Sequence, residues 1–416
     1  MITVAVPYDI GTGPAEIVAA GRACGVEVLL VVDSSSAHVA SLLPALRRRF
    51  DVLDVAGQPA AVDTVAARNP AGVVTFSDPC LPLAAAIAQR CGLSHWHSAT
   101  VTEALTDKLV QRRRLAAAGV DATPCAEIVS VADVRAALAV TGLPAVLKPR
   151  VGYGGQHVRR VDDLATAMAA AREFFAGSGG TTMVAEGLLT GDPTVAGPRW
   201  GDYVSVEAML CDGDYRTLGV TGKFPLAPPF REQGFFVPAP LGETAETQVR
   251  ACAERAVRAL GIRDGIVHTE LKLTPDGPRV IEVNGRAGGH VPDLLRRGAG
   301  VDVVELAIRI ALGQRPDVPE LVHDAVTFQY LLVAPQVVGT LRAVDGVDEV
   351  RALPGVEVVA LQKRLGDPVD WRDGEPGRLG AVSGRVPDHA ALAGLTTRVQ
   401  RAFRPIFEEG VLDVAA

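Results

Sequence analysis

The sequence has few cysteines, and none of them are paired at metal-binding or redox spacing. Six cysteines are scattered along 416 residues without a Cys-x-x-Cys pair. Such cysteines are mostly small buried hydrophobic residues, so we expect neither disulfides nor a zinc site. His95-Trp96-His97 offers two metal-binding side chains, but no third ligand is near in the sequence. We interpret this segment as an ordinary loop.

Long apolar runs are also missing, because charged residues, glycine or proline interrupt each one. We therefore expect no membrane span. The first residues, MITVAVPYDIGTG, contain no basic leader and continue directly into a predicted strand. The expectation is a cytoplasmic protein without a secretion signal.

An excess of positive charge is missing as well. The formal net charge is −7, which argues against nucleic acid as the main partner. Arginine runs occur at 47–49 and 112–114, each within an amphipathic helical pattern. We interpret both runs as solvated helix faces.

The composition, with 48% hydrophobic residues, is that of a soluble globular protein, and the length favours two to four domains. The N-terminal part alternates predicted strands (3–7, 26–32, 72–76) with helices (14–24, 37–49, 81–91). This alternation predicts a parallel sheet in a Rossmann-like layer. Its first turn, Gly11-Thr12-Gly13, lacks the third glycine of a dinucleotide fingerprint, so we expect a scaffold or half of a substrate pocket. One helix is predicted over 100–118.

Residues 120–185 are predicted to form a small unit around a glycine-rich loop. Lys148 ends a buried strand directly before the loop that contains Gly152, Gly154 and Gly155. Glycine N–H groups can approach a triphosphate closely, and the ammonium can neutralise it. A plain hairpin connection is the alternative. The P-loop pattern GxxxxGK[ST] is absent, and a strand follows the loop where a P-loop requires a helix.

The stretch 265–289, GIVHTELKLTPDGPRVIEVNGRAGG, predicts a hairpin of strands 268–273 and 279–284. With the turn centred on Asp276, Glu270 lies opposite Glu282 and His268 opposite Asn284. Facing carboxylates repel unless a positive charge lies between them. With the Asn284 amide oxygen they form an all-oxygen ligand set that suits Mg²⁺. The flanking residues are apolar, so we favour a buried metal site over a solvated surface hairpin.

The remainder of the chain is predicted to form a larger unit and a tail. The larger unit contains a hairpin of 203–210 and 215–221, a helix at 243–260 and a helix at 301–312 behind the acidic strands. After a strand at 326–333, the tail is expected to form another small α/β layer that ends at a helix over 388–407.

Lys108 on its helix, Lys148 before a glycine loop, Glu186 at a strand end and the Glu270…Glu282-x-Asn284 pair resemble the ATP-grasp superfamily in order and spacing. Four segments are most similar to the L-amino-acid ligases, bacterial dipeptide synthetases that include the bacilysin-pathway type. These segments are GDYVSVEAMLCDGDY (201–215), GKFPLAPPFREQGFFVPAPL (222–241), HTELKL (268–273) and EVNGRAGG (282–289).

The resemblance implies an α/β fold of the α+β ATP-grasp kind. It implies a Rossmann-like domain over 1–105, a small glycine-loop lid over 106–186, a larger antiparallel-sheet catalytic subdomain over 187–333 and a C-terminal α/β extension over 334–416.

The resemblance also implies a role for each site residue. Lys108, Lys148, Gly152, Gly154 and Gly155 bind the ATP phosphates; Glu186, Gly187, Leu188 and Leu189 hold adenine; Glu270, Glu282 and Asn284 hold two Mg²⁺ ions, for which Mn²⁺ can substitute; Arg286 steadies the transferring phosphoryl group; Glu232 faces the amino-acid substrate; Lys223 and His268 line the pocket. From the residues alone, Arg286 stands in a glycine-flanked bend that can bring its fork onto a phosphate or carboxylate.

Two positions depart from the family pattern. Gly187 stands where many relatives have a second acid, so adenine binding there rests on backbone contacts. Phe235 stands where some dipeptide ligases carry a histidine, which asks for a different acceptor or carboxylate.

The implied reaction joins the carboxylate of one amino acid to the amine of another through an acyl phosphate and yields a dipeptide, ADP and phosphate. The implied partners are small molecules, without nucleic acid or membrane, and the implied assembly is a homodimer. Two alternatives keep the site: a γ-glutamyl ligase in natural-product biosynthesis and a ligase of a non-amino-acid carboxylate. An NAD(P)-dependent oxidoreductase would leave the acidic hairpin unexplained, and a non-catalytic nucleotide-binding regulator would leave the complete lysine and carboxylate set without a use.

Overall fold

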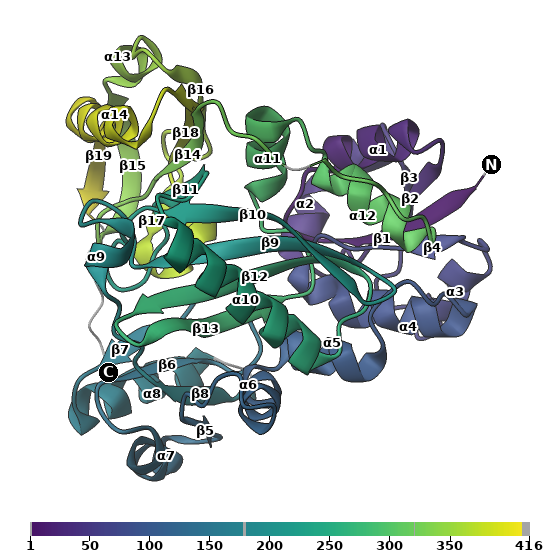
Figure 1. The fold of residues 1–416 in the computed structure, drawn as a ribbon, viewed down its shortest axis with the longest axis horizontal. Coiled ribbons are helices and arrows are strands. Elements are labelled where there is room, and N and C mark those ends of the chain that lie inside the picture. Colours follow the sequence, from purple (N-terminus) through teal and green to yellow (C-terminus); the bar gives the residue numbers. More distant parts are fainter. Residues whose placement is uncertain (1, 178–179, 320, 410–416) are drawn as a thin grey trace.

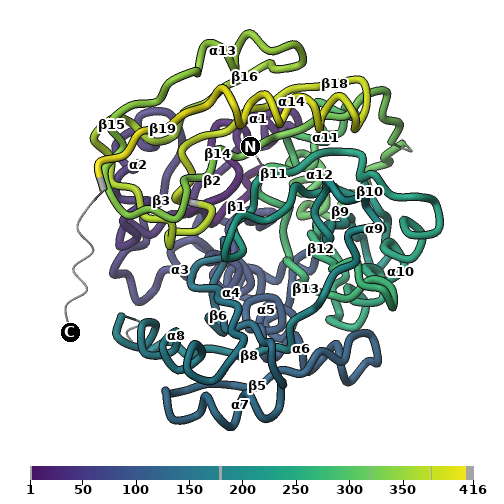
Figure 2. Tube along the Cα trace, turned by 90° about the vertical axis from the view of Figure 1, so that its left-hand side faces the viewer, coloured from purple at the N-terminus to yellow at the C-terminus, as the bar shows by residue number. Residues whose placement is uncertain are grey.

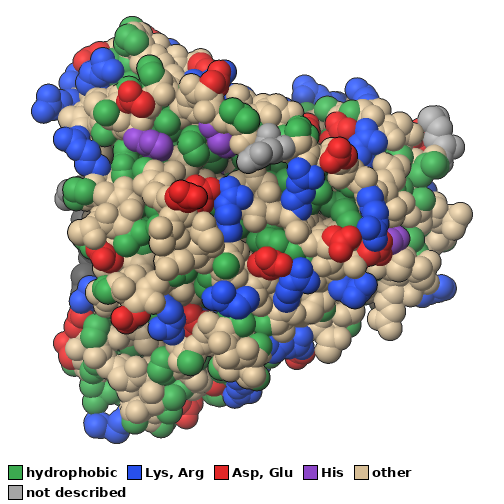
Figure 3. Space-filling model, viewed as in Figure 1, with side chains coloured by type: hydrophobic (Ala, Val, Ile, Leu, Met, Phe, Trp, Pro, Cys, Tyr) green, Lys and Arg blue, Asp and Glu red, His purple; other side chains and the backbone are tan. Residues whose placement is uncertain are grey.

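The computed structural model describes residues 2–177, 180–319 and 321–409. Within them the strands form four sheets, and no helix is both long and apolar enough to cross a membrane. Figure 1 shows the N-terminal layer at the right, a large sheet across the middle, the glycine-loop unit at the lower left and the C-terminal elements at the upper left. Basic and acidic side chains lie close to one another over the face seen in Figure 3.

The N-terminal layer is a parallel sheet of order β3-β2-β1-β4. Its strands are β1 Thr3–Tyr8, β2 Glu27–Val32, β3 Asp51–Asp54 and β4 Gly72–Val73, and its helices are α1 Pro14–Ala23, α2 Ala37–Arg47, α3 Ala61–Ala66 and α4 Leu81–Cys91. The predicted Rossmann-like layer is confirmed, although β3 and α3 were not predicted and β4 ends at Val73. A Cβ at Gly11 (φ 124°) would lie 2.2 Å from the carbonyl oxygen of Phe76, so close packing accounts for this glycine.

The single helix predicted over 100–118 is wrong, because two helices meet at Asp107. They are α5, Ala99–Thr106, and α6, Lys108–Ala117. The Asp107 carboxylate accepts the backbone N–H groups of Leu109 (3.0 Å) and Val110 (3.2 Å) and caps α6. Lys108 is therefore the first residue of α6.

The glycine-loop unit, residues 125–187, has its own antiparallel sheet of order β5-β8-β6-β7 and its own hydrophobic core. Its elements are β5 Cys125–Ile128, α7 Val134–Thr141, β6 Ala145–Pro149, β7 Arg159–Val161, α8 Leu164–Gly177 and β8 Met183–Gly187. The strand–helix–strand–loop–strand–helix–strand order agrees with the sequence, which predicts strands at 126–129, 144–149, 157–161 and 182–186 and helices at 131–140 and 162–175. Figure 2 shows the unit at the lower edge of the molecule, opposite the C-terminal helix α14.

The large sheet has eight strands in the order β13-β12-β9-β10-β11-β14-β18-β16. Its first part is formed by β9 Tyr203–Cys211, β10 Asp214–Lys223, β11 Gly234–Val237, β12 Gly265–Thr274, β13 Gly277–Asn284 and β14 Val326–Leu332, with helices α9 Pro193–Ala196, α10 Glu243–Leu260, α11 Val291–Ala299 and α12 Val303–Ala311. Helix α10 agrees with the prediction, whereas α11 was not predicted. One hydrophobic core joins this part of the sheet to the N-terminal layer.

The acidic hairpin, β12 with β13, has the predicted pairing at its functional end. Glu270 pairs with Glu282 and His268 with Asn284, as predicted. The turn, however, pairs Thr274 with Gly277 and is not centred on Asp276. A β-bulge that leaves Ile281 unpaired restores the predicted register before Glu282.

The C-terminal residues do not form the separate small layer that was predicted, and this expectation is corrected. Strands β16 Val356–Leu361 and β18 Gly380–Val386 extend the large sheet, because β18 pairs with β14 along its whole length. Only β15 Val338–Asp345, β17 Pro368–Asp370 and β19 Arg404–Glu409 form a sheet of their own. Helices α13 Val347–Arg351 and α14 His389–Ala402 complete this part, and a strand follows α14 where the predicted helix continued to 407. The four domain boundaries stay a prediction.

Candidate active site

A cavity of about 280 Å³ lies between the acidic hairpin, the glycine-loop unit, the N-terminal layer and a C-terminal segment. It gathers fifteen of the predicted site residues, namely Lys108, Lys148, Gly152, Gly154, Gly155, Glu186, Gly187, Leu188, Leu189, Glu232, His268, Glu270, Glu282, Asn284 and Arg286. Lys223 does not line the cavity and is fully buried behind it.

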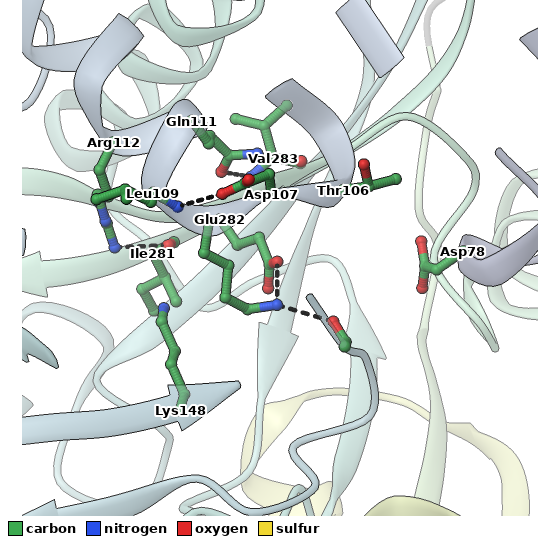
Figure 4. Close-up of polar contacts among 12 residues, drawn as sticks. Asp78, Thr106, Asp107, Leu109, Gln111, Arg112, Lys148, Ile281, Glu282 and Val283 are labelled. Atoms are coloured by element: carbon green, nitrogen blue, oxygen red, sulfur yellow. Dashed lines mark hydrogen bonds and ion pairs between the residues drawn. The ribbon is translucent and has the colours of Figure 1, made fainter. Parts of the chain in front are cut away.

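The facing carboxylates of the hairpin attract positive charge. The Lys108 ammonium lies 3.1 Å from Oε1 of Glu282 and donates a hydrogen bond to the Gly152 carbonyl (2.8 Å). Figure 4 shows Glu282 with this ion pair as a dashed line. The lysine at the start of α6 therefore connects the hairpin to the glycine loop.

Behind Glu270, a buried histidine lies between two glutamates. His268 Nδ1 is 2.9 and 3.0 Å from the two carboxylate oxygens of Glu207, and Nε2 is 3.1 Å from Oε1 of Glu270. Burial lowers the pKa of His268, but the charge of Glu207 and the two hydrogen bonds outweigh it and raise this pKa to about 9. Burial raises the pKa of Glu270, but the hydrogen bond from His268 and the charges of Lys223, His268 and Arg286 lower it to about 2. His268 is thus a doubly protonated donor that orients Glu270.

The free edge of β13 is covered by side chains of α6. The Gln111 amide accepts from the Val283 N–H (2.8 Å) and donates to its carbonyl (2.9 Å), while Arg112 donates to the carbonyls of Val280 (2.6 Å) and Ile281 (2.7 Å). Figure 4 shows Gln111 and Arg112 reaching β13 from α6. The side chain of Arg112 is 5% exposed, so the interpretation of 112–114 as a solvated face is wrong for Arg112. It fastens the bulge that sets the register of Glu282.

Arg112 also meets the glutamate predicted near adenine. Oε2 of Glu186 is 2.9 Å from both Arg112 Nη2 and Lys148 Nζ. Burial raises the pKa of Glu186, but these two charges and hydrogen bonds lower it to about 2. Its other oxygen, Oε1, is buried and has no hydrogen-bond partner among the described residues. A buried acceptor of this kind needs a donor such as an amine of a ligand.

Arg286 is held by an aspartate that the sequence analysis did not single out. Asp78 begins a short 3₁₀ turn, Asp78–Cys80, after β4. It accepts two hydrogen bonds from Arg286, one from Nε at 2.8 Å and one from Nη2. Nη1 donates to the carbonyl of Ala287 at 2.8 Å. The guanidinium plane is therefore fixed by residues that follow strands of two different sheets, β4 and β13.

The buried Lys223 forms an ion pair with the half-buried Glu232, which lines the cavity. Lys223 Nζ is 2.9 Å from Oε1 of Glu232 and lies 4.4 Å from the ring centre of Phe235. The hydroxyl of Tyr203 donates to the same Glu232 oxygen at 3.4 Å. Burial raises the pKa of Glu232 although Lys223 opposes the shift. Lys223 is thus placed to position Glu232 and not to touch a ligand.

The pair His95 and His97 is not a joint metal site in the described residues. His97 is buried, and its Nε2 hydrogen-bonds with the Gly285 carbonyl at 2.9 Å. His95, however, has the nearby acids that the sequence did not suggest, because its ligand atoms lie within 4.8 Å of those of Asp212 and Asp264. Asp212 is paired with Arg315 (2.7 Å), and Asp264 accepts the N–H of Asp212 (2.8 Å).

The cavity fits a nucleotide with a divalent cation. Glu270, Glu282 and Asn284 offer oxygen ligands on one hairpin, and Lys108 shows that a cation is attracted to Glu282. The orphan acceptor of Glu186 lies at one wall, and the glycine loop with Lys148 forms another. These are the residues that would hold ATP and its metal.

Comparisons with known proteins agree with this geometry. The ATP-grasp domain family matches residues 141–292, and the family described as L-amino acid ligase C-terminal domain 2 matches residues 331–407. The chain belongs to the ATP-grasp ligases, and within them it carries the C-terminal domain of the L-amino acid ligases.

Individual relatives are similar to this chain over much of its length. Carnosine synthase 1 of Homo sapiens is 30% identical over 72% of this chain and 38% of its own length. Alanine–anticapsin ligase of Bacillus subtilis is 26% identical over 65% of this chain and 58% of its own length. The chain thus spans less than two thirds of the length of these curated relatives. The crystal structure of an L-amino acid ligase from Bacillus licheniformis shares the fold, with a TM-score of 0.78, 22% identity and coverage of 98% of this chain and 99% of that one.

Proposed function

We propose that this chain is an ATP- and Mg²⁺-dependent ligase that joins the carboxylate of one amino acid to the amine of another. The observation that carries the proposal is the register of the acidic hairpin. Glu270 and Glu282 face each other in one cavity with Arg286, Lys148 and the glycine loop. This arrangement suits phosphoryl transfer to a carboxylate, because that step needs neutralisation of charge more than it needs a proton carrier.

The proposed reaction has two steps. A carboxylate oxygen of the first amino acid attacks the γ-phosphorus of ATP, the bond to ADP breaks and an acyl phosphate forms. The amine nitrogen of the second amino acid then attacks the acyl carbon, phosphate leaves and the amine loses a proton. The product is an amide, together with ADP and phosphate.

Different side chains of the cavity would contribute to each of these steps. Mg²⁺ at Glu270, Glu282 and Asn284 supplies a Lewis acid that neutralises phosphate charge when it is bound. Arg286, fixed by Asp78, keeps N–H groups of Nη1 and Nη2 for the transferring phosphoryl group. Lys148 neutralises phosphate charge, and the glycine loop over the cavity excludes water that would hydrolyse the acyl phosphate.

The family matches and one relative support amino acids as substrates. The C-terminal match is to a domain of L-amino acid ligases, and alanine–anticapsin ligase is named for a reaction of an amino acid. The α-linkage, the identity of both substrates, the substitution of Mn²⁺ and the homodimer stay predictions.

The test is phosphate release from Mg·ATP with the twenty amino acids, singly and in pairs, followed by mass spectrometry of the products. We expect release that depends on a pair and a product of dipeptide mass, whose fragmentation separates an α-linkage from a γ-glutamyl one. Glu282→Ala should lower turnover by more than about 100-fold, while Glu349→Ala, an exposed glutamate of α13, should not. Near-normal turnover of Glu282→Ala would refute the metal site, and no pair-dependent release would refute amino acids as both substrates.

A further inference from the structure

The acidic side chains that line the cavity differ in their partners. Five of them are paired with basic side chains of the site: Asp78 with Arg286, Glu186 with Arg112 and Lys148, Glu232 with Lys223, Glu270 with His268, and Glu282 with Lys108. The remaining acid among the described lining residues is Glu375. It belongs to the C-terminal segment and is not among the site residues predicted from the sequence.

Glu375 has one oxygen available to a ligand. It starts the 3₁₀ turn Glu375–Gly377, shortly before β18. Its Oε1 is 3.4 Å from Nε2 of His290 and 3.2 Å from Nη1 of Arg378. No hydrogen bond among the described residues involves Oε2, whereas Oε1 accepts one from Arg378. The side chain is 25% exposed and forms part of the cavity wall.

Glu375 carries a negative charge in the cavity. Burial raises its pKa, but the hydrogen bond from His290 and the charges of His290, Arg378 and Lys223 lower it to about 2. The ring of His290, which contacts Glu375, lies 5.8 Å from the ring of Phe235, and Phe235 lines the cavity. A carboxylate next to aromatic rings is a suitable environment for the ammonium group of an amino acid.

The same segment contacts the glycine loop. The backbone N–H of Glu375 donates to the carbonyl of Gly154 at 3.3 Å. A Cβ at Gly374 (φ 68°) would lie 2.6 Å from that carbonyl oxygen, so only glycine allows this approach. Nearby, the guanidinium of Arg159 on β7 lies 4.9 Å from the ring centre of Trp371. A ligand at Glu375 is therefore bound where the C-terminal segment meets the loop over the phosphates.

We propose that Oε2 of Glu375 receives the ammonium group of the amino acid that donates its carboxylate. The inference rests on the proposed function. The accepting amine must release its proton and approach the acyl carbon, whereas the ammonium of the donor does not react and stays charged. A fixed carboxylate suits the donor, and it makes the site select amino acids over carboxylic acids without an ammonium.

The experiment compares two donors in three proteins. Once the pair screen and product fragmentation identify the donor, its kcat/KM is measured beside that of its analogue with hydrogen in place of the ammonium, propionate where the donor is alanine. The proteins are wild type, Glu375→Gln and the control Glu349→Gln. Glu375→Gln retains the backbone contact to Gly154. We expect it to lower kcat/KM for the amino acid by roughly 10- to 100-fold, mainly through KM, and to leave the analogue and the KM for ATP unchanged.

Each other outcome overturns the inference. An equal loss for both donors would show that Glu375 acts only through the loop, and no loss would show that it does not bind the ammonium. A shortened carboxylate, Glu375→Asp, should lose less than Glu375→Gln, and an equal or greater loss would contradict a charge-based role even if the glutamine variant folds poorly. A wild-type protein inactive with every amino-acid pair would refute the proposed function and the inference with it, whereas an active wild type with an unaltered Glu375→Gln would refute the inference alone.

Discussion

Replacing Arg112 by methionine tests whether this buried arginine holds the site together. The substitution leaves the Glu186 carboxylate with Lys148 alone and removes the donors to the carbonyls of Val280 and Ile281. Removal of one partner of a buried ion pair costs about 3–5 kcal/mol. The pKa of Glu186 gives a similar magnitude: a fall from the ordinary 4.5 to about 2 corresponds to roughly 3 kcal/mol.

The sign of the pH dependence follows from the direction of this shift. Because folding lowers the pKa of Glu186, the stabilisation is present above about pH 4.5 and is lost as the pH falls through about 2. In Arg112→Met the pKa of Glu186 should rise, since burial remains and one cation is gone. The variant should therefore begin to lose stability at a higher pH than the wild type.

Urea unfolding followed by tryptophan fluorescence measures the effect. At pH 7 we expect Arg112→Met to lower the free energy of unfolding by about 3 kcal/mol. Arg113→Met, on the exposed side of the same helix, should change it by less than about 0.5 kcal/mol. A free energy of unfolding of Arg112→Met within about 1 kcal/mol of the wild-type value would refute this role of Arg112.

Three further predictions concern other parts of the site and the fold. The raised pKa of His268, about 9, stabilises the fold by roughly 3 kcal/mol below about pH 6.5, and this stabilisation is lost as the pH rises through 9. His268→Gln should therefore remove this pH dependence of the free energy of unfolding, measured in urea between pH 6 and 10. Wild-type and variant free energies that change in parallel with pH would contradict it. Asp107→Ala should cost about 1–2 kcal/mol through the lost cap and raise the KM for ATP by displacing Lys108, so an unchanged KM would argue against that placement. A Cβ at Gly234 (φ 123°) would lie 2.1 Å from a carbonyl oxygen of β14, so Gly234→Ala should lower stability by at least about 2 kcal/mol in thermal unfolding, whereas Gly242→Ala, which has open space, should not.

The sequence predicted those parts of the fold that depend on local pattern. Alternation and turn residues indicated the acidic hairpin, and the facing of Glu270 and Glu282 is confirmed. This pairing depends on a bulge at Ile281, which the sequence around it does not predict. Arg112 on helix α6 holds the bulge in place. The break at Asp107 had a signal, since an aspartate directly before the RRR-containing stretch is a good N-cap.

Other features of the site depend on residues far apart in the chain. Asp78 reaches Arg286 from the N-terminal layer, Glu207 reaches His268 from a neighbouring strand, and Glu375 enters from the C-terminal segment. Spacing along the chain carries no information on such contacts, because tertiary packing sets them. The burial of Arg112 was missed for the same reason: a charge on a helix is normally solvated, and only the position of Glu186 on β8 overrides that preference.

The pairing of β18 with β14 limits how such ligases can be recombined. A chimera that exchanges the chain after residue 333 would separate two strands that share seven aligned residue pairs. Phe328 on β14 is fully buried, and a foreign strand that fits poorly beside it would leave an unpaired sheet edge that is prone to association. A chimera that takes β14 together with the chain that follows it would preserve the pairing of β14 with β18. It would also include Glu375 and Gly374, which contacts the Gly154 carbonyl. The strand pairing and the proposed ammonium site at Glu375 are thus inherited together in this architecture.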